Sequence, residues 1–170
     1  MTALVTGALF KALSDSGLAV LRFNFRGVGA SEGSHDEGRG ERLDVLAAID
    51  ALTGELPDEM PLLLAGWSFG ADVALAVDHP AVAGWFAVAA PLRVVPPTEM
   101  AAADDPRPKV FAVAQHDQFR PPESLDEIVA GWPNTRAEVV AGADHFLVGR
   151  TDVVERLAVD FAGELETGAG

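Results

Sequence analysis

Residues 61–77, Pro61-Leu-Leu-Leu-Ala-Gly-Trp-Ser-Phe-Gly-Ala-Asp-Val-Ala-Leu-Ala-Val77, decide the fold. An apolar run leads into Gly-Trp-Ser-Phe-Gly at 66–70, and small residues at helical spacing follow it. This pattern predicts a nucleophile elbow, which consists of a strand, a sharp turn with a serine at its tip, and a helix. Glycines on both sides of the serine avoid collisions with the neighbouring strand and helix. We therefore expect the Ser68 hydroxyl to be lifted clear of the sheet, with the Phe69 amide at a helix N-terminus facing a developing oxyanion. An ordinary strand-to-helix turn is the alternative interpretation.

Strands and helices alternate along the whole chain. Apolar runs predict further strands at 18–25, 84–90, 109–114 and 136–141. Helical periodicity predicts helices at 4–13, 41–52, 123–130 and 153–161, and the proline-rich stretch 92–108 is a connector with room for one short helix. Nearly all-apolar strands are typical of a mainly parallel sheet covered by helices on both faces. We expect one α/β domain over 1–170, with functional loops at the carboxyl ends of its strands.

Composition excludes several classes of partner. The chain has 170 residues, with 12 Lys and Arg against 26 Asp and Glu, a net charge of −14. Such a surface repels nucleic acid and anionic membranes, so neither is expected as a partner. There is no cysteine, which excludes disulfides and thiolate metal sites. No signal peptide and no apolar run of about 20 residues is found. A cytoplasmic protein is the expectation, and its oligomeric state stays open.

The glycine-rich loop 26–33, Arg-Gly-Val-Gly-Ala-Ser-Glu-Gly, follows the predicted strand at 18–25. Its glycines could cradle a phosphate, but their spacing fits neither the P-loop nor the dinucleotide pattern, and the P-loop lysine is missing. We favour tight turns at the rim of the site.

A serine nucleophile needs a base to take its proton and a carboxylate to orient that base. The chain offers four histidines. His79 lies at the far end of the helix after Ser68, roughly 15 Å away at the helical rise per residue. His35 belongs to a polar loop, which is a poor platform for precise geometry. His116 and His145 each follow a predicted strand, at the edge where the serine lies.

Chain order separates these two candidates. The order serine, acid, histidine is that of the α/β-hydrolase fold, and Ser68, Asp117 and His145 follow it. His116 as the base would need a carboxylate other than its neighbour Asp117. Asp144 adjoins His145 in sequence and is badly placed to reach its ring.

Other features near these residues allow two interpretations. Trp67, Phe119 and Phe146 flank the predicted site and either line an acyl pocket or belong to the core. The adjacent His and Asp pairs at 35–36, 116–117 and 144–145 lack the ligand spacing of a metal site. We expect neither a metal nor another cofactor.

Four blocks together resemble a known family: residues 21–33, 65–71, 117–122 and 142–146. They are similar to the matching blocks of small bacterial α/β-hydrolases, compact and nearly lidless serine hydrolases often described as esterases related to the dienelactone-hydrolase branch. The resemblance implies Ser68 as nucleophile, Asp117 as acid and His145 as base, and no cofactor. Dienelactone hydrolases proper use a cysteine nucleophile, which this chain lacks.

The sequence departs from that family at its N-terminus. Members normally begin with further strands, the last of which lies between the strands equivalent to 18–25 and 61–67 and leads into a turn that donates a second oxyanion amide. Relative to them, this chain is N-terminally short: either the sequence starts late within a longer protein, or the fold is shortened. In a shortened fold the neighbours must close the gap or leave amides unpaired, at a cost of several kcal/mol. Losing one oxyanion donor costs ~10²–10³ in rate.

The leading prediction is hydrolysis of carboxylic esters or related small acyl compounds. A weak or inactive truncated domain with a binding or assembly role is the alternative. Acyl transfer or perhydrolysis by the same three residues would differ from hydrolysis only in the molecule that attacks the acyl-enzyme.

Overall fold

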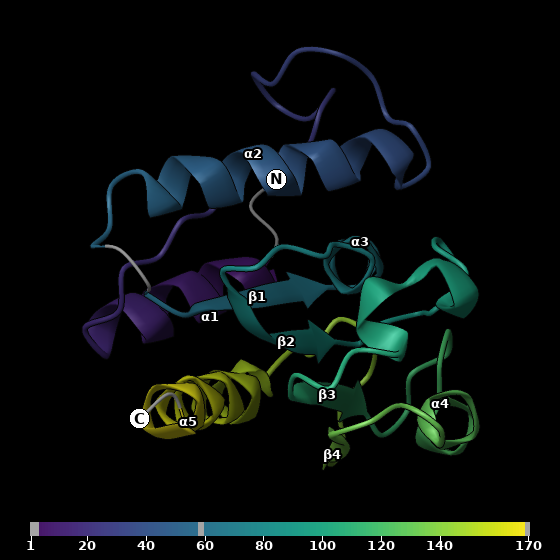
Figure 1. The fold of residues 1–170 in the computed structure, drawn as a ribbon. Coiled ribbons are helices and arrows are strands. Elements are labelled where there is room, and N and C mark those ends of the chain that lie inside the picture. The colour runs from purple at the N-terminus through teal and green to yellow at the C-terminus, as the bar shows by residue number, and fades with distance from the viewer. Residues whose placement is uncertain (1–3, 58–59, 169–170) are drawn as a thin grey trace.

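The computed structural model describes residues 4–57 and 60–168 of the chain. Its centre is a four-stranded sheet in the order β1-β2-β3-β4, in which each neighbouring pair is parallel. The strands are β1 (Leu62–Trp67), β2 (Val82–Val88), β3 (Lys109–Ala114) and β4 (Thr135–Val140). The predicted α/β class with a parallel sheet is confirmed (Figure 1).

Helices cover both faces of this sheet (Figure 1). One face packs against α1 (Leu4–Asp15) and α5 (Thr151–Gly168). The other packs against α2 (Arg39–Thr53), α3 (Phe69–Leu75) and α4 (Pro122–Val129). The connector carries two short 3₁₀ turns, η1 (Pro97–Glu99) and η2 (Ala101–Ala103). Within the described ranges, no helix has the length and apolar character that crossing a membrane requires.

Strand alternation divides the core into two layers. In β2, the buried Trp85 belongs to the cluster beneath α2, α3 and α4, while its neighbour Phe86 packs with Phe161 of α5. Successive side chains of a strand point to opposite faces, so a strand buried on both faces reads as an unbroken apolar run. This explains why the apolar runs of the sequence predicted these strands correctly.

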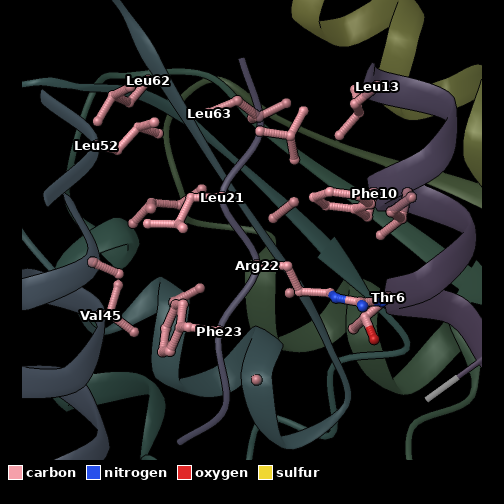
Figure 2. A pocket seen from close by; sticks show the side chains of 18 of the residues that line it. Thr6, Phe10, Leu13, Leu21, Arg22, Phe23, Val45, Leu52, Leu62 and Leu63 are labelled. Atoms are coloured by element: carbon pink, nitrogen blue, oxygen red, sulfur yellow. The ribbon is translucent and has the colours of Figure 1, made fainter. Parts of the chain in front are cut away.

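The predicted strand at 18–25 is wrong. The segment is not part of the sheet, and among the described residues no backbone hydrogen bond joins it to β1. It keeps a strand-like alternation: Figure 2 shows Leu21 and Phe23 pointing towards α2, and Arg22 pointing the opposite way, towards α1. The sequence therefore predicted the local alternation of side chains, but it could not supply the neighbouring strand that pairing requires.

A groove separates this segment from β1. It has a volume of about 1070 Å³, and it is lined by apolar side chains of α1, α2 and β1, including Phe10, Leu52 and Leu63, and by Ser68 (Figure 2). The segment 18–25 is anchored at its start by the bond from Leu18 N to Leu13 O at 3.2 Å. The segment 18–25 and β1 thus do not close the space between them.

Candidate functional site

Ser68 occupies the sharp turn between β1 and α3. Its φ of 53° and ψ of −121° are a strained backbone conformation for a residue with a side chain. The turn is fixed on one side by the bond from Ser68 N to Val88 O at 2.9 Å, which continues the pairing with β2. Strain held in this way lifts the hydroxyl above the carboxyl end of the sheet.

The two glycines of the elbow differ in their reasons for being glycine. A Cβ added to Gly66 would lie 2.4 Å from the carbonyl oxygen of Gly70, so a side chain at position 66 requires the backbone of the turn to move. A Cβ on Gly70 would meet only a ring carbon of Phe25, at an ordinary 3.8 Å. The expectation that both glycines prevent a collision holds for Gly66 and is wrong for Gly70.

Three polar side chains meet above the carboxyl ends of β1, β3 and β4. Ser68 Oγ lies 2.8 Å from His145 Nε2, and His145 Nδ1 lies 2.9 Å from Asp117 Oδ2. His145 and Asp117 are each only 3% exposed. Asp117 follows β3 and His145 follows β4, so the parallel order of the strands brings together residues that are far apart in the sequence.

Asp117 is held in place by its own loop. Its Oδ1 accepts hydrogen bonds from the amides of Phe119 at 2.8 Å and Arg120 at 3.2 Å. The Arg120 guanidinium in turn donates to the Pro91 carbonyl from both Nε and Nη2. The carboxylate that faces His145 is therefore oriented by backbone groups and tied to the loop that follows β2.

Aromatic rings surround the imidazole of His145. The ring centroid of Phe119 lies 4.5 Å away, that of Phe146 5.5 Å and that of Trp67 5.8 Å. Trp67 Nε1 also donates to the His145 carbonyl at 3.2 Å. Phe119 is 37% exposed and Phe146 is 50% exposed, so neither is a core residue. All three predicted pocket residues lie beside the imidazole.

The other candidate residues do not join this cluster. His116 is exposed, and its backbone amide donates to Ala143 O. His79 Nδ1 accepts the amide of Ala81, and the His35 ring pairs with the buried Glu41 at 2.9 Å. Asp144 accepts the amides of Phe146 and Leu147 in the turn after it. The described residues contain no group of three or more His, Cys, Asp or Glu arranged to hold a metal ion.

Comparison with known proteins shows the family of the fold. Over 161 residues the chain is 30% identical to the uncharacterized protein RP471 of Rickettsia prowazekii, a match that covers 89% of this chain and 68% of that protein. An α/β serine hydrolase homologue from Coxiella burnetii is similar with a TM-score of 0.80 and 32% identity, over 94% of this chain and 76% of that one. The chain belongs to the α/β-hydrolase family. XC6422 from Xanthomonas campestris, a member of the α/β serine hydrolases without a lid, gives a TM-score of 0.78 at 26% identity, over 93% of this chain and 72% of that one. No protein-family model matches the sequence.

In this α/β-hydrolase the Phe69 amide is the first of α3, where helix N–H groups have no acceptor within the helix. It follows Ser68 directly, at the position expected of an oxyanion donor. The second donor that the family resemblance implies would precede Leu4, and the described part of the chain begins at that residue.

One residue beneath the site was missed by the sequence reasoning. Asp72, in the first turn of the elbow helix, is completely buried, and its carboxylate accepts the amides of Leu92, Arg93 and Val94 at 2.9–3.0 Å. Burial raises the pKa of the Asp72 carboxyl, and the loop amides offset part of that effect. An acidic residue within an otherwise apolar helical run was the available signal, because a buried carboxylate needs partners.

Proposed function

We propose that this α/β-hydrolase is a serine hydrolase that cleaves carboxylic esters or related small acyl compounds. The observation that carries the proposal is the continuous hydrogen-bonded series from Ser68 through His145 to Asp117. A hydroxyl in contact with an imidazole, itself held by a buried carboxylate, is the arrangement that activates a serine. Similarity to a serine hydrolase homologue at 32% identity supports the same conclusion.

The reaction takes place in two halves. Ser68 Oγ adds to the ester carbonyl carbon while His145 Nε2 takes the hydroxyl proton, and Asp117 stabilises the imidazolium through Nδ1–H. The Phe69 amide donates to the oxyanion. When the intermediate collapses, the bond to the leaving alkoxide breaks and His145 protonates it. Water, deprotonated by the same imidazole, then cleaves the acyl-enzyme and releases the carboxylic acid and free Ser68.

The surroundings of the imidazole favour small substrates. Phe119, Phe146 and Trp67 form an apolar wall beside His145, and such a wall suits the acyl or alcohol part of a small ester.

The experiment combines a covalent probe with a matched pair of histidine variants. We expect a fluorophosphonate to label the wild-type protein, and a short-chain chromogenic ester to be hydrolysed. Both signals should disappear in Ser68→Ala, and hydrolysis should fall at least 10³-fold in His145→Ala, by analogy with other triads. His116→Ala is the control, because His116 is exposed and outside the series. Labelling that persists in Ser68→Ala would remove Ser68 from the mechanism.

A binding or assembly role is the second candidate. The open apolar groove beside β1 is the observation that favours it. No labelling and no turnover by well-folded wild-type protein would support this candidate. Acyl transfer uses the same residues with another acceptor, and product analysis in the presence of an alcohol or peroxide distinguishes it from hydrolysis.

A further inference from the structure

The loop after β2 is a rigid part of the site. The amide of Arg93 donates to Asp72 Oδ2 at 3.0 Å, and the amides of the residues on either side bond the same buried carboxylate. The guanidinium of Arg120 fixes the start of this loop at Pro91 O. The backbone from which the Arg93 side chain projects is thus held at four points, so its position relative to the site is well defined.

The Arg93 side chain reaches the wall of the proposed active site. Its guanidinium carbon lies 4.7 Å from the centroid of the Phe119 ring, and that ring lies 4.5 Å from the imidazole of His145. One aromatic ring therefore separates a positive charge from the catalytic base. A guanidinium stacked on a ring uses its face, and the N–H groups at its edge remain available as donors.

Arg93 has no acidic partner in the described part of the chain. Arg22, Arg120 and Arg150 form no ion pair there either, but Arg120 and Arg150 donate to backbone carbonyls, and Arg22 lies over Phe10 of α1. Arg26, Arg107 and Arg136 each lie within 2.8 Å of a carboxylate oxygen. Across residues 4–57 and 60–168, by contrast, no side chain forms an ion pair or hydrogen bond with the exposed guanidinium of Arg93. Arg93 thus combines an unpaired guanidinium with a place on the ring that contacts His145, in a chain where acidic residues outnumber basic ones by 26 to 12.

We propose that Arg93 is a specificity-determining residue that binds a carboxylate of the substrate. The preferred substrates are then small esters that carry a free carboxylate, such as half-esters of dicarboxylic acids. The inference rests on the proposed function. The planar fork of a guanidinium matches the two oxygens of a carboxylate. Because one ring lies between Arg93 and His145, the carboxylate and the scissile carbonyl must be joined by a short linker rather than be adjacent.

The test compares monomethyl adipate with dimethyl adipate, in which the second carboxylate is blocked. We expect the wild-type protein to hydrolyse the monoester with at least tenfold higher kcat/KM. Arg93→Gln should remove this preference, mainly through KM, and leave the diester within twofold of wild type, while Arg93→Lys should retain part of it. Arg156→Gln removes the same charge from an exposed position on α5 and is the control. Equal losses on both esters in Arg93→Gln would mean that Arg93 only supports Phe119 and would overturn the proposal.

Binding to Ser68→Ala protein separates this proposal from the proposed function. Calorimetry with monomethyl adipate should give at least tenfold weaker affinity when Arg93→Gln is added to Ser68→Ala. Such a difference without any hydrolysis by wild type would reject the esterase and retain the carboxylate site. Affinity that is the same with and without Arg93 would reject the site, whatever the wild-type protein hydrolyses.

Discussion

The two edges of β1 have different surroundings. Along one edge the strand pairs with β2 from Leu62 to Trp67, and the bonds from Leu62 N to Ala81 O and from Ser68 N to Val88 O, both 2.9 Å, lie at the two ends of the ladder. Along the other edge lies the groove of about 1070 Å³, with the segment 18–25 beyond it. In a parallel ladder the backbone groups of alternate residues point to opposite sides. Those of Leu63 and Ala65 therefore face the groove.

The proposed chemistry depends on the paired edge. Ser68 ends β1, Asp117 follows β3 and His145 follows β4, and each of these strands belongs to the continuous ladder. The site can therefore be positioned although, among residues 4–57 and 60–168, no strand pairs with the other edge of β1.

The unpaired backbone groups along the groove edge of β1 cost less free energy than they would in a gap closed to water. Leu21 is 44% exposed and Phe23 is 40% exposed, so water reaches this segment. Backbone groups that bond to water avoid most of the penalty for a buried, unsatisfied donor or acceptor. The cost that remains is apolar surface left in contact with solvent.

Two carboxylates give the largest expected contrast between these regions. Asp117 orients His145 on the paired side, while Asp44 holds Arg26 at the end of the segment 18–25, with 2.8 Å between Oδ1 and Nη2. The same hydrogen bond to Arg26 lowers the pKa of Asp44. We expect Asp117→Asn to lower kcat by about 10⁴-fold, because the amide no longer holds the imidazole in the required tautomer. Asp44→Asn should lower it less than about tenfold, because that carboxylate contacts none of the reacting groups.

Steady-state kinetics with a chromogenic ester measures both variants, and circular dichroism checks that they fold. Equal losses would show that the groove side is as much a part of the site as the paired side.

Two phenylalanines provide the next contrast, in stability. Phe111 of β3 is 1% exposed and packs against Trp132, whereas Phe23 borders the groove. We expect Phe111→Ala to cost about 3–5 kcal/mol of unfolding free energy, since it leaves a cavity in a packed core. Phe23→Ala should cost less than about 1 kcal/mol, because a large part of this ring already contacts water. Urea denaturation of both variants measures the difference. A cost at Phe23 that matches the cost at Phe111 would mean that the groove is closed in solution.

Local patterns in the sequence predicted most of the fold and most of the proposed site. The run from Pro61 to Val77 predicted the strand, turn and helix around Ser68, and chain order selected His145 over His116. The fold prediction is confirmed because it uses short-range rules. The rule that the carboxyl ends of parallel strands share one edge accounts for the place of His145 beside Ser68, and its role as the base stays a prediction.

Apart from the expectation for Gly70, what the sequence did not predict concerns interactions between distant residues. The alternation at 18–25 is typical of a strand, but pairing depends on a neighbour that no local pattern encodes. The contacts of Asp72 in α3 with Leu92 to Val94, and of Arg93 with Phe119, likewise join segments that are distant in the sequence. Only the folded chain brings these residues together.

The elbow glycines give the smallest expected contrast, and the two effects have opposite signs. Gly66 lies in β1, and a methyl group there would meet the Gly70 carbonyl oxygen at 2.4 Å, so the backbone of the turn must move. We expect Gly66→Ala to cost about 1–3 kcal/mol, as overpacking does, and to lower activity by displacing Ser68. Gly70 lies in α3 with an ordinary 3.8 Å of space towards Phe25. Because alanine is the better helix former, Gly70→Ala should be neutral or stabilising by up to about 1 kcal/mol. Thermal unfolding of the two variants measures both changes in stability. Destabilisation by Gly70→Ala as well would mean that a side chain at position 70 also meets a neighbour, and the steric reason given for Gly66 would then apply to both positions.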